Sequence, residues 1–128
     1  MSRSRKTSKA QSSPLTWDSF KALARAYPEV EEGLSYGTPG LKVRGKFLAR
    51  LREDGETIAI RIDMDHRAVM IEANPEAFFF TDHYANYPAM LIRMSAAREA
   101  DVVDLIEDAW RNLATKKAIA AFDSDRSA

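Results

Sequence analysis

Cysteine is absent from this chain of 128 residues. Its absence excludes a disulfide scaffold, thiolate zinc sites, iron-sulfur ligation by cysteine and a cysteine nucleophile. The apolar runs are far shorter than the roughly 20 residues that span a bilayer. Ser12, Ser13 and Pro14 stand where a secretory signal would need an apolar stretch. We therefore expect a soluble, cytoplasmic protein with no membrane partner.

Motifs for catalysis or metal binding are also missing. The sequence has no glycine-rich phosphate loop, nucleophile elbow or zinc-protease motif, and no carboxylate pair that can be placed across a cleft. Of the two histidines, His66 follows Asp63 and Asp65, either of which would more simply cap a helix than hold a metal. We expect no enzymatic activity, no metal and no cofactor.

Glycine is scarce and confined to one region. All five glycines lie between residues 33 and 55, where apolar residues alternate with polar ones. This pattern predicts antiparallel strands over residues 31–36, 40–44, 46–52 and 57–63. Arg44-Gly45 and Asp54-Gly55 are the expected turns, and Asp54-Gly55 is the stronger hairpin signal.

Helical patterns flank this region. Thr16 is a plausible N-cap for an apolar stripe from Trp17 to Tyr27, which Pro28 ends. Further patterns predict helices over 65–74 and 100–114 and after Thr115, and strands over 78–80 and 89–94. The fold class expected is α+β, an antiparallel sheet with terminal helices packed on one face and the element order α-β-β-β-β-α-β-β-α-α. One domain over 15–122 would lie between a disordered basic tail, 1–14, and a disordered C-terminal tail, 123–128.

The neutral net charge hides a segregation along the chain. Residues 1–13 carry four basic residues and no acid, which leaves 15 basic and 19 acidic residues in the remainder. The tail is either a tether for nucleic acid or a solubilising leader with no partner. Its basic residues are Arg3, Arg5, Lys6 and Lys9.

Alternation along the strands separates two faces of the expected sheet. It predicts Phe47, Ala49 and Leu51 inward and Leu48 outward with the neighbouring cations. The outward face would then collect seven cations: Lys42, Arg44, Lys46, Arg50, Arg52, Arg61 and Arg93. Such a face is either an anion-binding surface, for nucleic acid or a phosphate-bearing ligand, or an open sheet whose cations deter aggregation.

A second candidate site is the loop from Asp82 to Pro88. His83, Tyr84 and Tyr87 carry apolar bodies with polar tips and could line a pocket together with Tyr36. The alternative is a packed loop whose rings close one end of the core. On the terminal helices, Trp17 and Trp110 are both expected to face inward, over the inner sheet face.

The most distinctive run extends from Ser35 to Phe47, with Gly37-Thr38-Pro39 at a tight turn. With this run the sequence resembles the MmcQ/YjbR family. The resemblance spans residues 15–122. It continues in Pro28 to Glu32, Asn74-Pro75, His83-Tyr84 with Tyr87-Pro88, and Glu107 to Arg111.

This resemblance implies a compact α+β fold similar to the frataxin-like and secretion-chaperone-like arrangements. Family members are commonly labelled DNA-binding, and the family offers no agreed catalytic residues to transfer. Our first hypothesis is a non-enzymatic module that binds DNA or another polyanion weakly and without sequence preference through the basic sheet face. The alternative is a module that binds a small anionic ligand or an acidic peptide at the open sheet and the loop from His83 to Pro88. A monomer is favoured.

Overall fold

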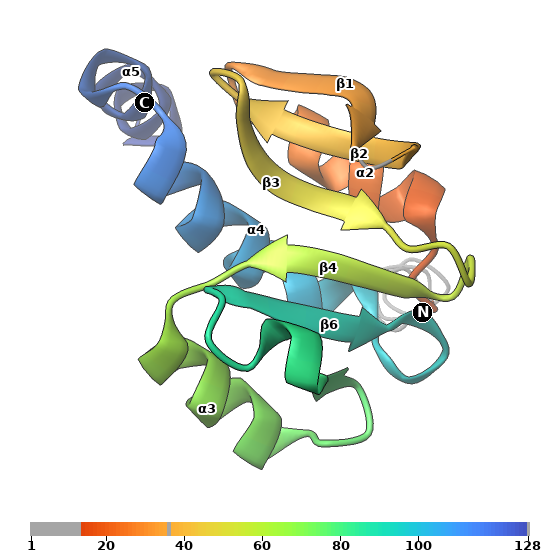
Figure 1. Ribbon diagram of the computed structural model, residues 1–128. Helices are drawn as coiled ribbons and strands as arrows, with labels where there is room; N and C mark the ends of the chain where they lie inside the picture. The colour runs from red at the N-terminus through yellow and green to blue at the C-terminus, as the bar shows by residue number, and fades with distance from the viewer. Residues whose placement is uncertain (1–13, 36, 128) are drawn as a thin grey trace, which may run out of the picture.

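The computed structural model describes residues 14–35 and 37–127 (Figure 1). For Ser127 it describes the backbone alone. The element order is the predicted one, α-β-β-β-β-α-β-β-α-α, with two short 3-10 turns added. The bounds are α2 Trp17–Arg25, β1 Val30–Ser35, β2 Thr38–Val43, β3 Lys46–Leu51, β4 Thr57–Arg61, α3 Met64–Ala73, β5 Phe78–Phe79, η1 Asp82–Tyr84, β6 Ala89–Arg93, η2 Met94–Ala96, α4 Glu99–Leu113 and α5 Lys116–Ser127. None of the helices in these ranges is long and apolar enough to cross a membrane.

The six strands form one antiparallel sheet in the order β1-β2-β3-β4-β6-β5. Helices α2 and α4 lie behind this sheet in Figure 1, and α4 contacts β3 and β4. Helix α3 adds Met70 and Ile71 to the same core. The predicted α+β fold with helices on one face is confirmed, and we call the opposite side the helix-free face.

The main core lies between the helices and the sheet. Trp110 is fully buried there, and its indole N–H donates to the carbonyl oxygen of Pro28 at 2.7 Å. Trp17 is half-buried at the edge of the core, with its ring 5.8 Å from that of Phe20. Thr16 caps α2 as predicted, because its hydroxyl accepts the Ser19 N–H. Both indoles therefore pack toward the core, Trp110 completely and Trp17 in part.

A β-bulge in β3 overturns the predicted alternation. Leu41 pairs with Ala49 while Lys42 pairs with Phe47, so Leu48 is an extra residue in β3. Leu48 and Ala49 both belong to the main core, whereas Phe47 packs with a smaller cluster on the helix-free face. The prediction of Phe47 inward and Leu48 outward was wrong, because one inserted residue exchanges the faces on the two sides of a bulge.

Both predicted turns are present, at Arg44-Gly45 and at Asp54-Gly55, but the tighter of the two is not the one expected. Arg44 and Gly45 have φ values of 54° and 79°, as a two-residue turn matched to the strand twist requires. At the other turn only Gly55 has a positive φ, 72°, and the Asp54 carboxylate accepts the N–H groups of Glu56 and Thr57. The tight hairpin is therefore at Arg44-Gly45, and Asp54 stabilises a longer loop through its side chain.

The C-terminal segment is helical where a disordered tail was expected. Thr115 accepts the Ala118 N–H at the start of α5, as predicted, but α5 continues to Ser127. Phe122 packs against Tyr27 and Trp110, with ring centroids 4.9 and 5.1 Å away. The prediction of a tail over 123–128 was wrong for the residues described.

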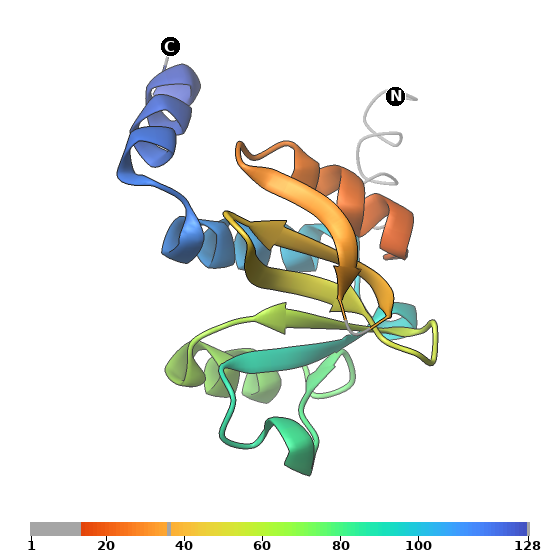
Figure 2. The same cartoon turned by 45° about the horizontal axis from the view of Figure 1, so that its top comes forward.

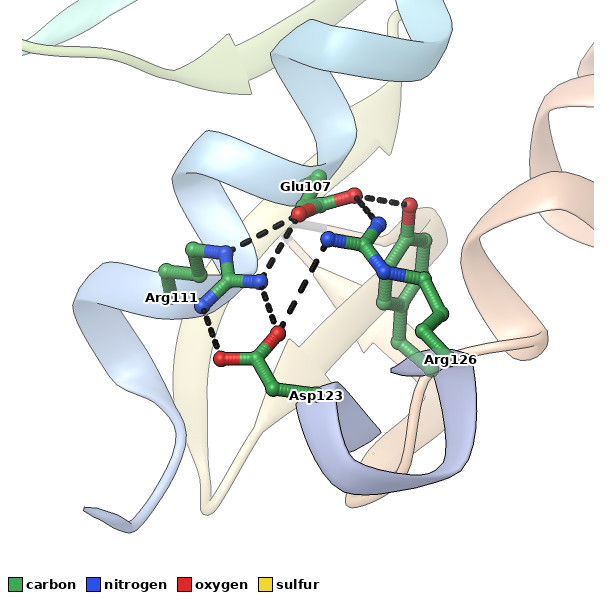
Figure 3. A network of polar contacts seen from close by, with 5 residues as sticks. Glu107, Arg111, Asp123 and Arg126 are labelled. Atoms are coloured by element: carbon green, nitrogen blue, oxygen red, sulfur yellow. Dashed lines mark hydrogen bonds and ion pairs between the residues drawn. The ribbon is translucent and has the colours of Figure 1, made fainter. Parts of the chain in front are cut away.

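Charged groups attach this extension of α5 to α4 (Figure 3). Arg111 forms ion pairs with Asp123 and with Glu107, the latter at 3.0 Å. Arg126 reaches the same Glu107 carboxylate at 2.9 Å, and the Tyr27 hydroxyl donates to it at 3.1 Å. The isolated sequence of residues 123–127 gives no sign of these contacts, because all the partners lie in other elements.

Candidate binding cleft on the helix-free face

Five of the seven predicted cations lie on the helix-free face. Arg50 pairs across the sheet with Ala59, and Ala59 with Leu91, which places Arg50 opposite the main core. Lys42, Arg61 and Arg93 share this side by register, and the Arg52 guanidinium lies 5.7 Å from the ring centroid of Tyr84. Five cations are thus gathered on one side of an acidic domain.

Arg44 and Lys46 do not join them. Arg44 lies in the β2–β3 turn and donates to the carbonyl oxygen of Leu113 at the end of α4, and Lys46 directly follows the turn. Lys46 pairs with Val43, whose side chain belongs to the main core. The expectation that all seven cations share one face was wrong, because Arg44 is a turn residue and the bulge at Leu48 reverses the orientation of Lys46.

Three of the cations of the helix-free face contact other groups of the protein. Arg50 was predicted to be exposed, but it is only 7% exposed. Its guanidinium donates a hydrogen bond to the Thr38 hydroxyl at 3.0 Å and forms an ion pair with Glu53 at 3.5 Å. Arg61 donates to the carbonyl oxygen of Phe47 at 2.9 Å. The guanidinium of Arg93 lies 4.3 Å from the ring centroid of Phe79. These contacts hold the positive charges in fixed places.

The helix-free face was predicted to be an open sheet, but a segment of the chain covers part of it. Residues 81–88, with the short turn η1, lie over it and bury Tyr84 to 6% exposure against Ala59, Ala89 and Leu91. Phe47 and Phe79 complete this second apolar cluster. The packed-loop alternative is correct for Tyr84, whereas His83 and Tyr87 remain exposed.

Arg67 holds the covering segment in place and was not singled out from the sequence. It comes from α3 and is nearly buried, and its guanidinium donates to the carbonyl oxygens of residues 84, 85, 87 and 89. The distances are 2.8–3.2 Å, and the Phe80 ring centroid lies 3.9 Å from the guanidinium carbon. A lone arginine on the apolar flank that includes Met70 and Ile71 was the available signal.

The segment and the sheet enclose a cleft of about 390 Å³. Of the predicted pocket residues, His83, Tyr84 and Tyr87 line it, and Tyr36 lies outside the described residues. Among the described residues Phe47 and Arg50 also line it, and neither was predicted as a pocket residue. The rings of His83 and Tyr84 meet edge to face at 4.9 Å, and those of Tyr84 and Tyr87 are 6.1 Å apart. We call this site the aromatic cleft.

The aromatic cleft combines flat apolar surfaces with polar tips and one guanidinium. Aromatic rings bind planar groups by offset stacking or edge contacts, and a guanidinium attracts carboxylate or phosphate. Burial fixes Tyr84 and Arg50, while Tyr87 at the rim is 44% exposed. This chemistry is suited to binding a flat molecule with a negative charge.

No group of three or more metal-ligating side chains occurs within residues 14–35 and 37–127. Asp63 caps α3 by accepting the His66 N–H at 2.8 Å, which is the predicted capping role. The His66 imidazole lies 3.7 Å from the Asp108 carboxylate. The proposed tether residues Arg3, Arg5, Lys6 and Lys9 lie outside the described residues.

Comparison with known proteins agrees with this architecture. The chain is 32% identical over 69 residues to the uncharacterized proteins Mb2600 of Mycobacterium bovis and Rv2570 of Mycobacterium tuberculosis. The match covers 53% of this chain and 54% of each relative, so the chain spans about half the length of the curated relatives it matches.

A solved structure shows the same fold. The crystal structure of Deinococcus radiodurans protein DR2400, described as a DUF419 domain, superposes with a TM-score of 0.61. It covers 78% of this chain and 79% of its own at 13% identity. The YjbR family model matches residues 25–112, from the end of α2 to the last turn of α4. The chain therefore belongs to the YjbR family, as the motifs around Ser35 to Phe47 suggested.

Proposed function

We propose that this protein is a non-enzymatic binding module whose ligand is a small, planar molecule carrying a negative charge. The observation that carries the proposal is the aromatic cleft itself. Phe47 from β3 and Tyr84 and Tyr87 from the covering segment meet around Arg50. Stacking surfaces and a positive charge are thus combined in one concave site.

The surroundings of the cleft support binding because they hold it in shape before a ligand arrives. Arg67 fixes the covering segment by four hydrogen bonds to backbone carbonyls. Tyr84 is anchored in the second apolar cluster. A site that needs little ordering on binding keeps more of its interaction energy as affinity.

A thermal-shift screen of planar aromatic carboxylates, with nucleosides as planar counterparts that lack the charge, tests the proposal. A ligand at 100 times its Kd adds about 2.7 kcal/mol to stability, which such a screen detects. We expect hits whose stabilising effect disappears in Tyr87→Ala, because Tyr87 lines the cleft. Tyr87 is exposed at the rim, so the substitution spares the core. Leu34→Ala is the matched control, since Leu34 is 71% exposed on β1.

Stabilisation that persists in Tyr87→Ala would contradict the proposal, and so would a screen without a hit. Acidic peptides belong in the same screen. A response to peptides alone would favour a protein partner over a small molecule.

Nucleic-acid binding is a second candidate, favoured by the five cations that share the helix-free face. These cations are Lys42, Arg50, Arg52, Arg61 and Arg93. Contacts to phosphate alone would give weak binding without sequence preference. If about five phosphates are neutralised, log K should fall with log salt at a slope of about −4 to −5. A flat salt response, or no binding to duplex DNA at about 50 mM salt, would exclude this function.

A further inference from the structure

A second hollow lies on the helix-free face, next to the aromatic cleft. Its volume is about 280 Å³. Its lining is Arg52, Asp54, Glu56, Thr57, Phe79, Arg93 and Ser95. Arg52 connects the two sites, because its guanidinium lies over the ring of Tyr84, which lines the cleft. The two sites therefore adjoin at Arg52 and Tyr84.

Strand register brings two guanidinium groups to this hollow. Thr57 at the start of β4 pairs with Arg93 on β6, and its carbonyl oxygen accepts the Arg52 N–H at 2.8 Å. Arg52 and Arg93 thus flank Thr57 on its two sides. Paired arginines with their planar donor forks are the usual means of holding a phosphate.

The Nε–H of Arg52 is buried and has no hydrogen-bond partner among the described residues. A buried donor without an acceptor is costly, and such groups in a folded protein need an explanation. Arg52 lines the hollow, so a shift of its side chain toward an oxyanion bound there would give this donor an acceptor. Arg93 is exposed and already stacked on Phe79, so its guanidinium is positioned at the opposite wall.

Two acids also line the hollow, and they differ in role. The Asp54 carboxylate accepts three hydrogen bonds, from the Glu56 N–H and from the N–H and hydroxyl of Thr57, so it stabilises the turn. The bond from Glu56 lowers the pKa of Asp54, which keeps it ionised. Glu56 is exposed and can turn its charge toward solvent. Its repulsion would limit the affinity for an anion.

We infer that the ligand is an aromatic phosphate of the nucleoside monophosphate type, with its ring in the aromatic cleft and its phosphate between Arg52 and Arg93. This inference rests on the proposed function, since it places the ring in the same cleft. It adds the ligand class and a second subsite. It also assigns opposite roles to Arg93, which attracts the phosphate, and Glu56, which repels it.

Isothermal titration of the full chain with AMP, GMP, CMP and UMP, and with the parent nucleosides, tests this assignment. We expect at least one monophosphate to bind about tenfold more tightly than its nucleoside, the gain expected of charge-assisted hydrogen bonds. Arg93→Gln should remove that difference and leave the nucleoside affinity unchanged. Glu56→Gln should increase the difference in affinity between the monophosphate and its nucleoside. Lys116→Gln on α5 is the control for a change of one charge elsewhere.

Equal affinity for nucleoside and monophosphate, with Arg93→Gln and Glu56→Gln silent, would overturn the phosphate subsite and leave the cleft proposal standing. No binding of any of the four monophosphates would also overturn it. Inorganic phosphate that binds as tightly as the best monophosphate would contradict joint use of cleft and hollow. Failure of the cleft itself would show separately, as planar aromatic carboxylates that also fail to bind.

Discussion

Among single residues, Arg67 is the one that attaches residues 81–88 to the rest of the helix-free face. Its buried guanidinium serves four backbone carbonyls of the segment that closes the cleft. Removing Arg67 leaves those carbonyl oxygens without their donor. The loss of stability is larger than that from removing an exposed ion pair. The integrity of the aromatic cleft therefore depends on a residue outside its lining.

We predict that Arg67→Met lowers the free energy of unfolding by about 3 kcal/mol. Urea denaturation measures the change, and Glu72→Ala, exposed on the same helix, should stay within about 0.5 kcal/mol. Similar small changes for both variants would mean that the segment is held by its apolar contacts and not by Arg67.

Leu48 and Phe47 test the bulge in β3. Leu48 is fully buried in the main core, whereas Phe47 is half-buried at the cleft. Leu48→Ala should cost about 2–5 kcal/mol. Phe47→Ala should cost less stability but weaken ligand binding. The two measurements are urea unfolding and titration, and the reverse ranking in stability would restore simple alternation along β3.

Residue patterns predicted which side chains face the core correctly in β4 but not throughout β3. In β4, Ile58 and Ile60 face the core as expected. In β3 the sequence Phe47-Leu48-Ala49 contains no glycine or proline to mark the inserted residue. A bulge depends on pairing with Leu41 of the neighbouring strand, so one strand alone cannot reveal it.

At the scale of elements, α5 shows how charge attaches a helix. Hydrogen bonds from Arg111 lower the pKa of Asp123. Partial burial acts to raise the pKa of Glu107, but hydrogen bonds from Arg111, Tyr27 and Arg126 outweigh it and lower that pKa. Carboxyls with lowered pKa values in the folded state stabilise it above their ordinary pKa near 4, and this contribution is lost as the pH falls.

We predict that α5 detaches from α4 as the pH falls below about 4. Trp110 fluorescence reports the change, because Phe122 of α5 packs against its indole. Asp123→Asn should show the weakened state already at neutral pH, whereas Asp125→Asn on the same helix should behave as wild type. An acid transition that is identical in all three proteins would exclude the ion pairs as its cause.

Alkali should act on the same junction through Tyr27. Burial, followed by the nearby charge of Glu107, raises the pKa of Tyr27 to about 12. The folded state therefore holds the phenol proton where the unfolded state has lost it. Stability should fall as the pH rises from about 10 to 12, and Tyr27→Phe should remove that dependence in denaturation curves followed at each pH.

Element order was predictable, and element partners were not. Caps such as Thr16, Asp63 and Thr115 and the period of the apolar residues located the helices and strands. The length of α5 depends on Arg111 and Glu107 in α4, contacts that local patterns do not contain. The placement of residues 81–88 depends in the same way on Arg67 of α3.

In the whole molecule, the two faces of the sheet differ in what covers them. Helices α2 and α4 bury the main core against one face, and Figure 2 shows them on the same side of the sheet. The other face carries the aromatic cleft and the hollow beside it, so substitutions at the cleft rim leave the main core intact. Trp110→Ala should cost about 3–5 kcal/mol and Tyr87→Ala less than about 1 kcal/mol in urea unfolding.

We propose that the aromatic cleft is the binding site of this protein. Chemical-shift mapping by NMR during titration with a nucleoside monophosphate tests it most directly. We expect shifts that concentrate on the ring signals of Phe47, Tyr84 and Tyr87 and extend to Arg52 and Arg93. Shifts confined to the groove between α2, α4 and α5, around Val103 and Phe122, or spread evenly over exposed cations, would contradict it.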